Sequence, residues 1–139
     1  MKKEMNNKGF SLVELIIVIA IMAVLVGVLA PQFLKYVESS RVQKDESAAA
    51  EVLNAVKIAC SVEDVYKEVS NGTTVKVSDG TIDCGSVTKL ADELALTIDA
   101  GEIEFTSKAH TGQTYTITIE IDSANGTVKV TGAWPGSST

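Results

Sequence analysis

The chain has few of the residue types on which enzymes and cofactor-binding proteins rely. Aromatic residues make up 5% of its 139 residues, and it has one histidine, two cysteines, two prolines and one tryptophan. Few side chains are therefore available to stack on bases, sugars or haem. No nucleophile motif, phosphate-binding loop or zinc spacing occurs, and His110 has no second ligand at metal spacing. We expect a protein that is not an enzyme and holds no cofactor or metal, with His110 solvated in a loop.

The sign of the charge excludes further partners. The formal net charge is −6, and the first nine residues are basic, with Lys2, Lys3 and Lys8 against Glu4. The rest of the chain therefore carries 9 basic and 17 acidic side chains, a net charge of −8. Nucleic-acid backbones and anionic membrane surfaces repel such a domain, so no nucleic acid is expected as its partner.

One long apolar run stands out from this polar background. Of the 21 residues from Phe10 to Ala30, only Ser11, Glu14 and Gly27 are not apolar. As a helix the run is about 31 Å long, the hydrocarbon thickness of a bilayer. The lysines before it predict a single membrane span with a cytoplasmic N terminus and the remainder of the chain outside. The alternative is a secretory signal peptide cleaved after Ala30.

Glu14 is a carboxylate inside this apolar run. Such a group costs on the order of 3 kcal/mol in a membrane helix, so it needs a partner. The run contains no lysine or arginine, and Lys8 lies on a different helix face. The neutralising cation is therefore expected to come from elsewhere.

The residues around this boundary resemble the processing site of type IV pilins. The resemblance lies in the sequence Lys-Gly-Phe-Ser-Leu-Val-Glu from Lys8 to Glu14, followed at once by the apolar run. In that family a prepilin peptidase of the inner membrane cuts after the glycine and methylates the new N-terminal residue. The resemblance implies a cut between Gly9 and Phe10, N-methylation of Phe10, and pairing of its amine with Glu14 of a neighbouring subunit. Ser11 stands where many members have threonine.

The resemblance also implies a function. Residues 10–36 of many copies would pack in the core of a helical homo-oligomeric filament, built by an assembly platform in the cytoplasmic membrane. The product would be an extracellular pilus that serves adhesion, motility or DNA uptake. A pseudopilin of a type II secretion system has the same kind of N terminus and is one alternative. A secreted binding module cleaved after Ala30 is the other.

Pro31 adds a local feature to the helix. A proline removes the hydrogen bond to the residue four positions back, here Gly27, and crowds its carbonyl. Gly27 and Pro31 therefore predict a stretch that bends easily, and the family uses such a stretch during assembly. The alternative is that Pro31 ends the membrane helix at the water interface.

After Pro31 the apolar spacing predicts that the helix continues to Val69, with a stop at Asn71-Gly72. Its apolar stripe is expected to contain Val42, Ala49, Val52, Val56, Ala59, Tyr66 and Val69. The sequence thus predicts one helix of about 60 residues, apolar all round in its first half and amphipathic in its second.

Alternating residues then predict strands, and one short helix lies between them. The expected strands lie around Val75–Val77, Ile103–Phe105, Tyr115–Ile121 and Val128–Val130, and the short helix begins at a Ser86 cap. The fold class is α+β, a long N-terminal α-helix packed against a small antiparallel β-sheet head. We expect a leader at 1–9, a membrane or filament-core segment at 10–30 and an extracellular head at 31–139.

Two cysteines and several acidic groups complete the candidates. Outside the cell, Cys60 and Cys84 are expected to form a disulfide, whereas a reducing compartment would keep them as free thiols. The acidic residues near Asp79 and Asp99 either are solvated in loops or form a calcium site. Asn71 and Asn125 match the glycosylation pattern, and each is followed by glycine, which favours a turn.

Overall fold

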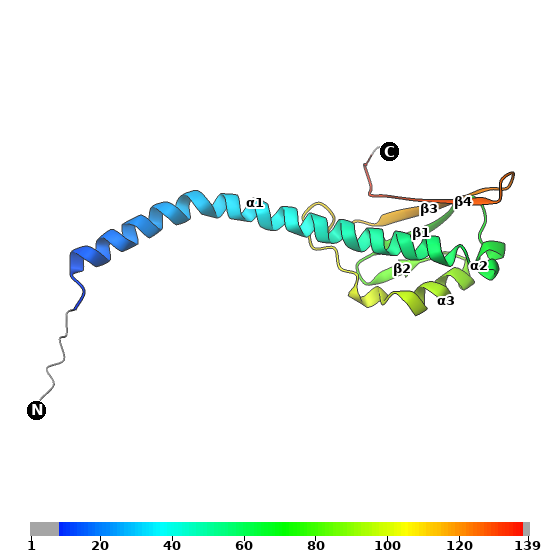
Figure 1. Ribbon diagram of the computed structural model, residues 1–139, viewed down its shortest axis with the longest axis horizontal. Helices are drawn as coiled ribbons and strands as arrows, with labels where there is room; N and C mark the ends of the chain where they lie inside the picture. Colours follow the sequence, from blue (N-terminus) through cyan, green and yellow to red (C-terminus); the bar gives the residue numbers. More distant parts are fainter. Residues whose placement is uncertain (1–8, 138–139) are drawn as a thin grey trace, which may run out of the picture. The chain divides into compact units, whose positions relative to one another are not determined.

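The computed structural model describes residues 9–137, and the α+β class predicted from the sequence is confirmed. The chain divides into two compact units, residues 1–37 and residues 38–139. In chain order the elements are α1 (Leu12–Ala59), α2 (Glu63–Glu68), β1 (Thr73–Ser78), β2 (Thr81–Asp83), α3 (Thr88–Thr97), the 3₁₀ turn η1 (Ala100–Glu102), β3 (Tyr115–Asp122) and β4 (Thr127–Ala133) (Figure 1).

The four strands form one antiparallel sheet in the order β2-β1-β3-β4. Val75 of β1 lies opposite Ile117 of β3, and Ile119 lies opposite Val130 of β4. The predicted alternation is confirmed, because side chains on β3 alternate between buried and more exposed positions along most of the strand. The strand β2 carries too short an apolar pattern to be predicted.

The core of the second unit lies between the sheet and the helices. The C-terminal half of α1 runs along the sheet (Figure 1), and the residues it buries there include Ala49, Val52 and Val56. Burying apolar side chains on both sides of this contact is the main force that holds the unit together. The stripe predicted for the helix is confirmed at most positions, but Val42 is only half-buried and Tyr66 is exposed.

The long helix ends ten residues earlier than the sequence predicts. The amide groups of Ser61 and Val62 bond to the carbonyl groups three residues back, those of Ile58 and Ala59. Three-residue bonds tighten the last turn and end an α-helix. Residues 63–68 then form the separate helix α2, so the apolar spacing continues across a break that no glycine or proline marks.

The cap predicted for the short helix is wrong. Helix α3 begins at Thr88 after Val87, and the side chain before it makes no capping bond. Its first amide groups, those of Thr88 and Lys89, instead donate to the carboxylate of Glu68 at 3.2 and 2.7 Å. A carboxylate at a helix N terminus has the same effect as a local cap, because it accepts unpaired amide groups and meets the positive end of the helix dipole.

Candidate functional site

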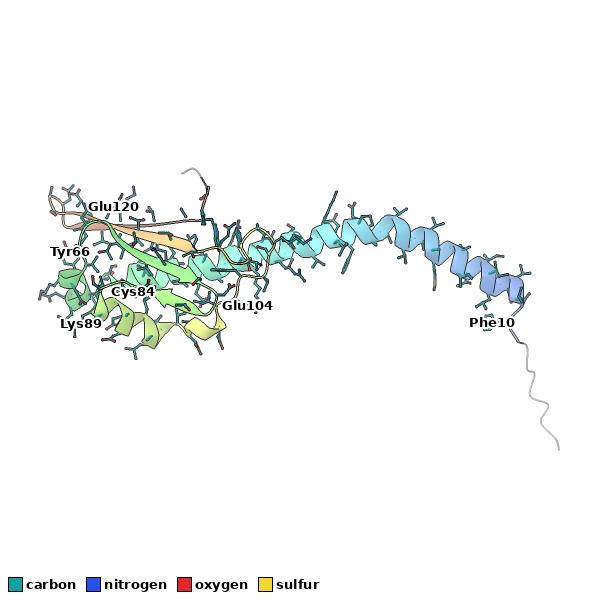
Figure 2. All side chains as sticks on the ribbon, turned by 180° about the vertical axis from the view of Figure 1, so that it is seen from behind. Phe10, Tyr66, Cys84, Lys89, Glu104 and Glu120 are labelled. Atoms are coloured by element: carbon teal, nitrogen blue, oxygen red, sulfur yellow. The ribbon has the colours of Figure 1, made fainter. Side chains whose placement is uncertain are left out.

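The predicted processing site lies at the start of α1. Gly9 and Phe10 precede the helix without regular structure, and the Phe10 side chain is 92% exposed (Figure 2). A Cβ atom added to Gly9 would meet no atom within 4 Å. The packing of the chain itself therefore does not require glycine at this position. Residues 1–8 of the predicted leader lie outside the described part of the chain.

The first part of α1 carries an apolar surface on every side. Side chains project all around the helix from its first turn (Figure 2), and none of the residues from Leu12 to Tyr36 is buried or half-buried. An 18-residue window of this helix has a mean hydropathy of 3.1 and no buried residue. It is the one helix in the described residues that is long and apolar enough to cross a membrane. A bare apolar helix of this length needs lipid or other helices around it.

Glu14 has a partner that the sequence analysis missed. Its Oε2 atom accepts a hydrogen bond from the backbone N–H of Ser11 at 2.9 Å. The spacing Ser-x-x-Glu from Ser11 to Glu14 is the sequence signature of a capping box and is the signal that indicates this bond.

Pro31 does not end the helix. It lies inside α1, which continues to Ala59, so the alternative of a helix stop at the water interface is wrong. A Cβ atom added to Gly27 would meet no atom within 4 Å, so packing within the chain does not require that glycine either. Glycine in a helix interior costs about 1 kcal/mol relative to alanine. The predicted bending at Gly27 and Pro31 stays a prediction.

The segment around Phe105 is not the strand that the alternation predicts. Ile103 and Phe105 are buried as expected, but the backbone bonds of the segment go to carboxylates. Four consecutive amide groups donate to three acidic side chains: Phe105 to Asp79, Thr106 and Ser107 to Asp45, and Lys108 to Glu38. Because these donors are satisfied without a neighbouring strand, the segment stays outside the sheet.

Asp45 of α1 is the central acceptor. Its side chain is 0% exposed and accepts from Thr106 and Ser107 at 2.9 Å each, while His110 Nδ1 lies 3.5 Å from its Oδ2. Burial acts to raise the pKa of Asp45, but the hydrogen bonds from Ser107 and Thr106 and the nearby His110 outweigh it. The net effect is a pKa below the usual value. No sequence pattern indicates this role, because an aspartate within an amphipathic helix is normally solvated.

We expect Asp45 to carry part of the acid sensitivity of the second unit. Since its pKa is lowered by folding, its contribution to stability is complete above the unfolded-state pKa and is lost as the pH falls through the folded-state value. Urea unfolding of the wild type and of Asp45→Asn between about pH 6 and pH 2 should give free energies that converge in acid. A constant difference between the two proteins across this range would contradict the assignment.

His110 is not the solvated loop residue that the sequence predicts. It is 8% exposed, and its ring stacks on Trp134 with centroids 3.8 Å apart and an interplanar angle of 8°. Phe105 and Tyr115 also pack against the Trp134 ring. Trp134, which follows β4, thus packs against the core of the second unit, and His110 is part of that packing.

The two cysteines are buried free thiols in the structure, and both belong to the core of the second unit. Burial raises the pKa of Cys60, and burial together with Asp83 raises the pKa of Cys84 to about 11. A thiol with so high a pKa is a poor nucleophile at neutral pH. The predicted disulfide is not formed in this structure and stays a prediction for the exported protein.

The acidic and asparagine candidates bond within the chain. Asp79 and Asp99 accept backbone amide groups, from Phe105 and Gly101 respectively. Within residues 9–137, no group of three or more histidine, cysteine or acidic side chains is gathered to hold a metal ion. Asn125 bonds to Asp122 in the turn between β3 and β4, where Gly126 has a φ of +64°. The turn predicted at Asn125 fits that geometry.

The N-terminal part of the chain matches a known sequence family. The prokaryotic N-terminal methylation motif covers residues 5–30. The chain therefore carries a prepilin-type N terminus, which confirms the resemblance seen at residues 8–14. A similar protein is the prepilin peptidase-dependent protein A of Clostridium perfringens, which is 25% identical over 118 residues. The alignment covers 85% of this chain and 81% of that protein. No solved structure matches the chain significantly.

The motif, the similar protein and the fold together support a type IV pilin-like or pseudopilin-like protein. Its apolar N-terminal helix is consistent with membrane anchoring before assembly.

Proposed function

We propose that this chain is the structural subunit of a type IV pilus. A prepilin peptidase cuts it after Gly9 and methylates Phe10, and the first part of α1 then polymerises into an extracellular filament. The observation that carries the proposal is the apolar surface of α1, exposed on all sides directly behind a prepilin-type motif. Apolar surface of this extent is stable only in lipid before assembly and among other helices afterwards.

The order of events follows from the chemistry of the N terminus. Lysines before the span keep the leader in the cytoplasm, and the remainder of the chain lies outside. The name of the similar protein from C. perfringens states that it depends on prepilin peptidase, which supports the same processing step here. The new amine of Phe10 then pairs with Glu14 of a neighbour, while a membrane platform adds subunits.

The three segments predicted from the sequence divide these tasks. Residues 1–9 are the leader, residues 10–30 the membrane or filament-core segment, and residues 31–139 the extracellular head. Gly27 and Pro31 allow the helix to bend during packing, which fits the open space around Gly27. An oxidising exterior favours a bond between Cys60 and Cys84.

A structural role agrees with the chemistry of the second unit. His110 is covered by Trp134, and the raised pKa of each cysteine makes its thiol a poor nucleophile. A pseudopilin of a type II secretion system would use the same N terminus in a short filament. We favour a pilus. The cell fraction in which the protein is recovered distinguishes a pilus subunit from a pseudopilin.

The test is the intact mass and N-terminal sequence of protein sheared from intact cells. We expect a chain that starts at Phe10 and is one methyl group heavier than its sequence, and a Gly9→Val variant that keeps its leader. Processed protein that stays with the cell envelope would favour the pseudopilin. A chain that starts at Pro31 would contradict the filament, because the apolar helix and Glu14 would be gone.

A further inference from the structure

The start of α1 contains one of the two hydrogen bonds that define a capping box. Ser11 is the cap, since its carbonyl accepts the first helical bond from the Leu15 amide at 3.2 Å. Glu14, the third residue of the helix, reaches back and accepts the Ser11 N–H at 2.9 Å. One carboxylate thus satisfies an amide group that would otherwise have no partner at the helix end.

This bond matters more in a membrane than in water. A helix end in an apolar medium leaves its first amide groups unpaired, and the aligned peptide dipoles make that end positive. Glu14 both accepts a hydrogen bond there and carries the opposite charge. The carboxylate is therefore stabilised by its own helix before any second subunit is present.

Processing leaves this arrangement in place. The predicted cut breaks the peptide bond between Gly9 and Phe10, whereas the donor is the N–H of the next residue, Ser11. The cut creates an amine on Phe10, which adds positive charge to the same end of the helix. The helix end of the mature subunit therefore attracts the Glu14 carboxylate at least as strongly as that of the unprocessed chain.

We propose that Glu14 caps its own helix in the unassembled subunit, and that filament growth exchanges this partner for the Phe10 amine of a neighbour. The inference rests on the proposed function. It gives the backbone N–H of Ser11 the role of holding Glu14, and it removes the need for an unpaired charge in the membrane. At Glu14, the free energy of assembly then includes only the difference between the interactions with the two partners. A subunit can therefore remain in the membrane until it is added to the filament.

The test uses the full chain, unassembled in detergent micelles, and measures hydrogen exchange of the Ser11 amide by NMR. Glutamine at position 14 still accepts a hydrogen bond and suits a capping box, whereas leucine cannot accept one. We expect Glu14→Leu to speed exchange at Ser11 about five- to tenfold, the usual effect of losing a cap. Glu14→Gln should stay within about twofold of the wild type, as should the control Val18→Leu, one turn further along.

Filament yield in cells is the second readout. Both Glu14 variants should fail to form filaments, because neither carries the charge that the exchange requires. Exchange unchanged in Glu14→Leu, or raised equally in Glu14→Gln, would overturn the cap. Wild-type chains that never form filaments would overturn the proposed function instead, and the micelle measurement would still decide the cap.

Discussion

A chain shortened to residues 31–139 should fold into the same sheet and helices and remain in solution, whereas the full chain should sediment with membranes. The described residues before position 37 contribute no buried side chain, and the buried core extends from Asp45 to Val130. Removing the apolar segment therefore takes away no buried side chain. It does remove the surface that favours lipid over water.

Two measurements check this prediction. Fractionation of cells should move nearly all of the protein from the membrane to the soluble fraction, and no filaments should form. The thermal midpoint of the shortened chain should lie within a few degrees of that of the full chain in detergent. A shortened chain that aggregates or lacks a cooperative transition would show that the second unit needs the apolar segment. One that still sediments with membranes would place a membrane-binding surface in the second unit.

The periodic parts of the chain were predictable from sequence because one physical cause dominates them. Burial on one face imposes alternation on β3, and continuous exposure to lipid or partner helices imposes an unbroken apolar run before Pro31. The processing site was equally clear, because its glycine, phenylalanine and glutamate lie together at the edge of that run.

What sequence reasoning missed are polar contacts between residues far apart in the chain. Glu68 caps α3, which begins twenty residues later in the chain. The local pattern indicated the nearby Ser86 as the cap instead. Asp45 bonds to amide groups 61 and 62 residues away, and this turned an expected strand at Phe105 into an irregular segment. Local patterns carry no information about such partners. The Glu14 cap is different, because its Ser-x-x-Glu spacing is local and can be recognised in the sequence.

Replacing Asp45 by alanine should be among the most damaging single changes in the second unit. The change leaves the amide groups of Thr106 and Ser107 without acceptors, and an unsatisfied buried donor costs about 1–3 kcal/mol. Ser107 is buried and Thr106 is partly buried, so together the two donors lead us to expect a loss of about 2–4 kcal/mol in the free energy of unfolding. That is a large part of the 5–15 kcal/mol by which small domains are usually stable.

Urea unfolding of residues 31–139 at neutral pH checks this value, with Trp134 fluorescence as the probe. Glu46 is the matched control, because it neighbours Asp45 on the same helix and is exposed, so Glu46→Ala should change stability by less than about 0.5 kcal/mol. Asp45→Asn keeps one acceptor oxygen and should fall between the two. The fluorescence should also report the loss directly, because Trp134 is the only tryptophan and stacks on His110 beside Asp45. If Asp45→Ala were as stable as the control, the carboxylate would not be what holds this segment against α1. Packing around Trp134 alone would then have to explain why residues 103–114 stay outside the sheet.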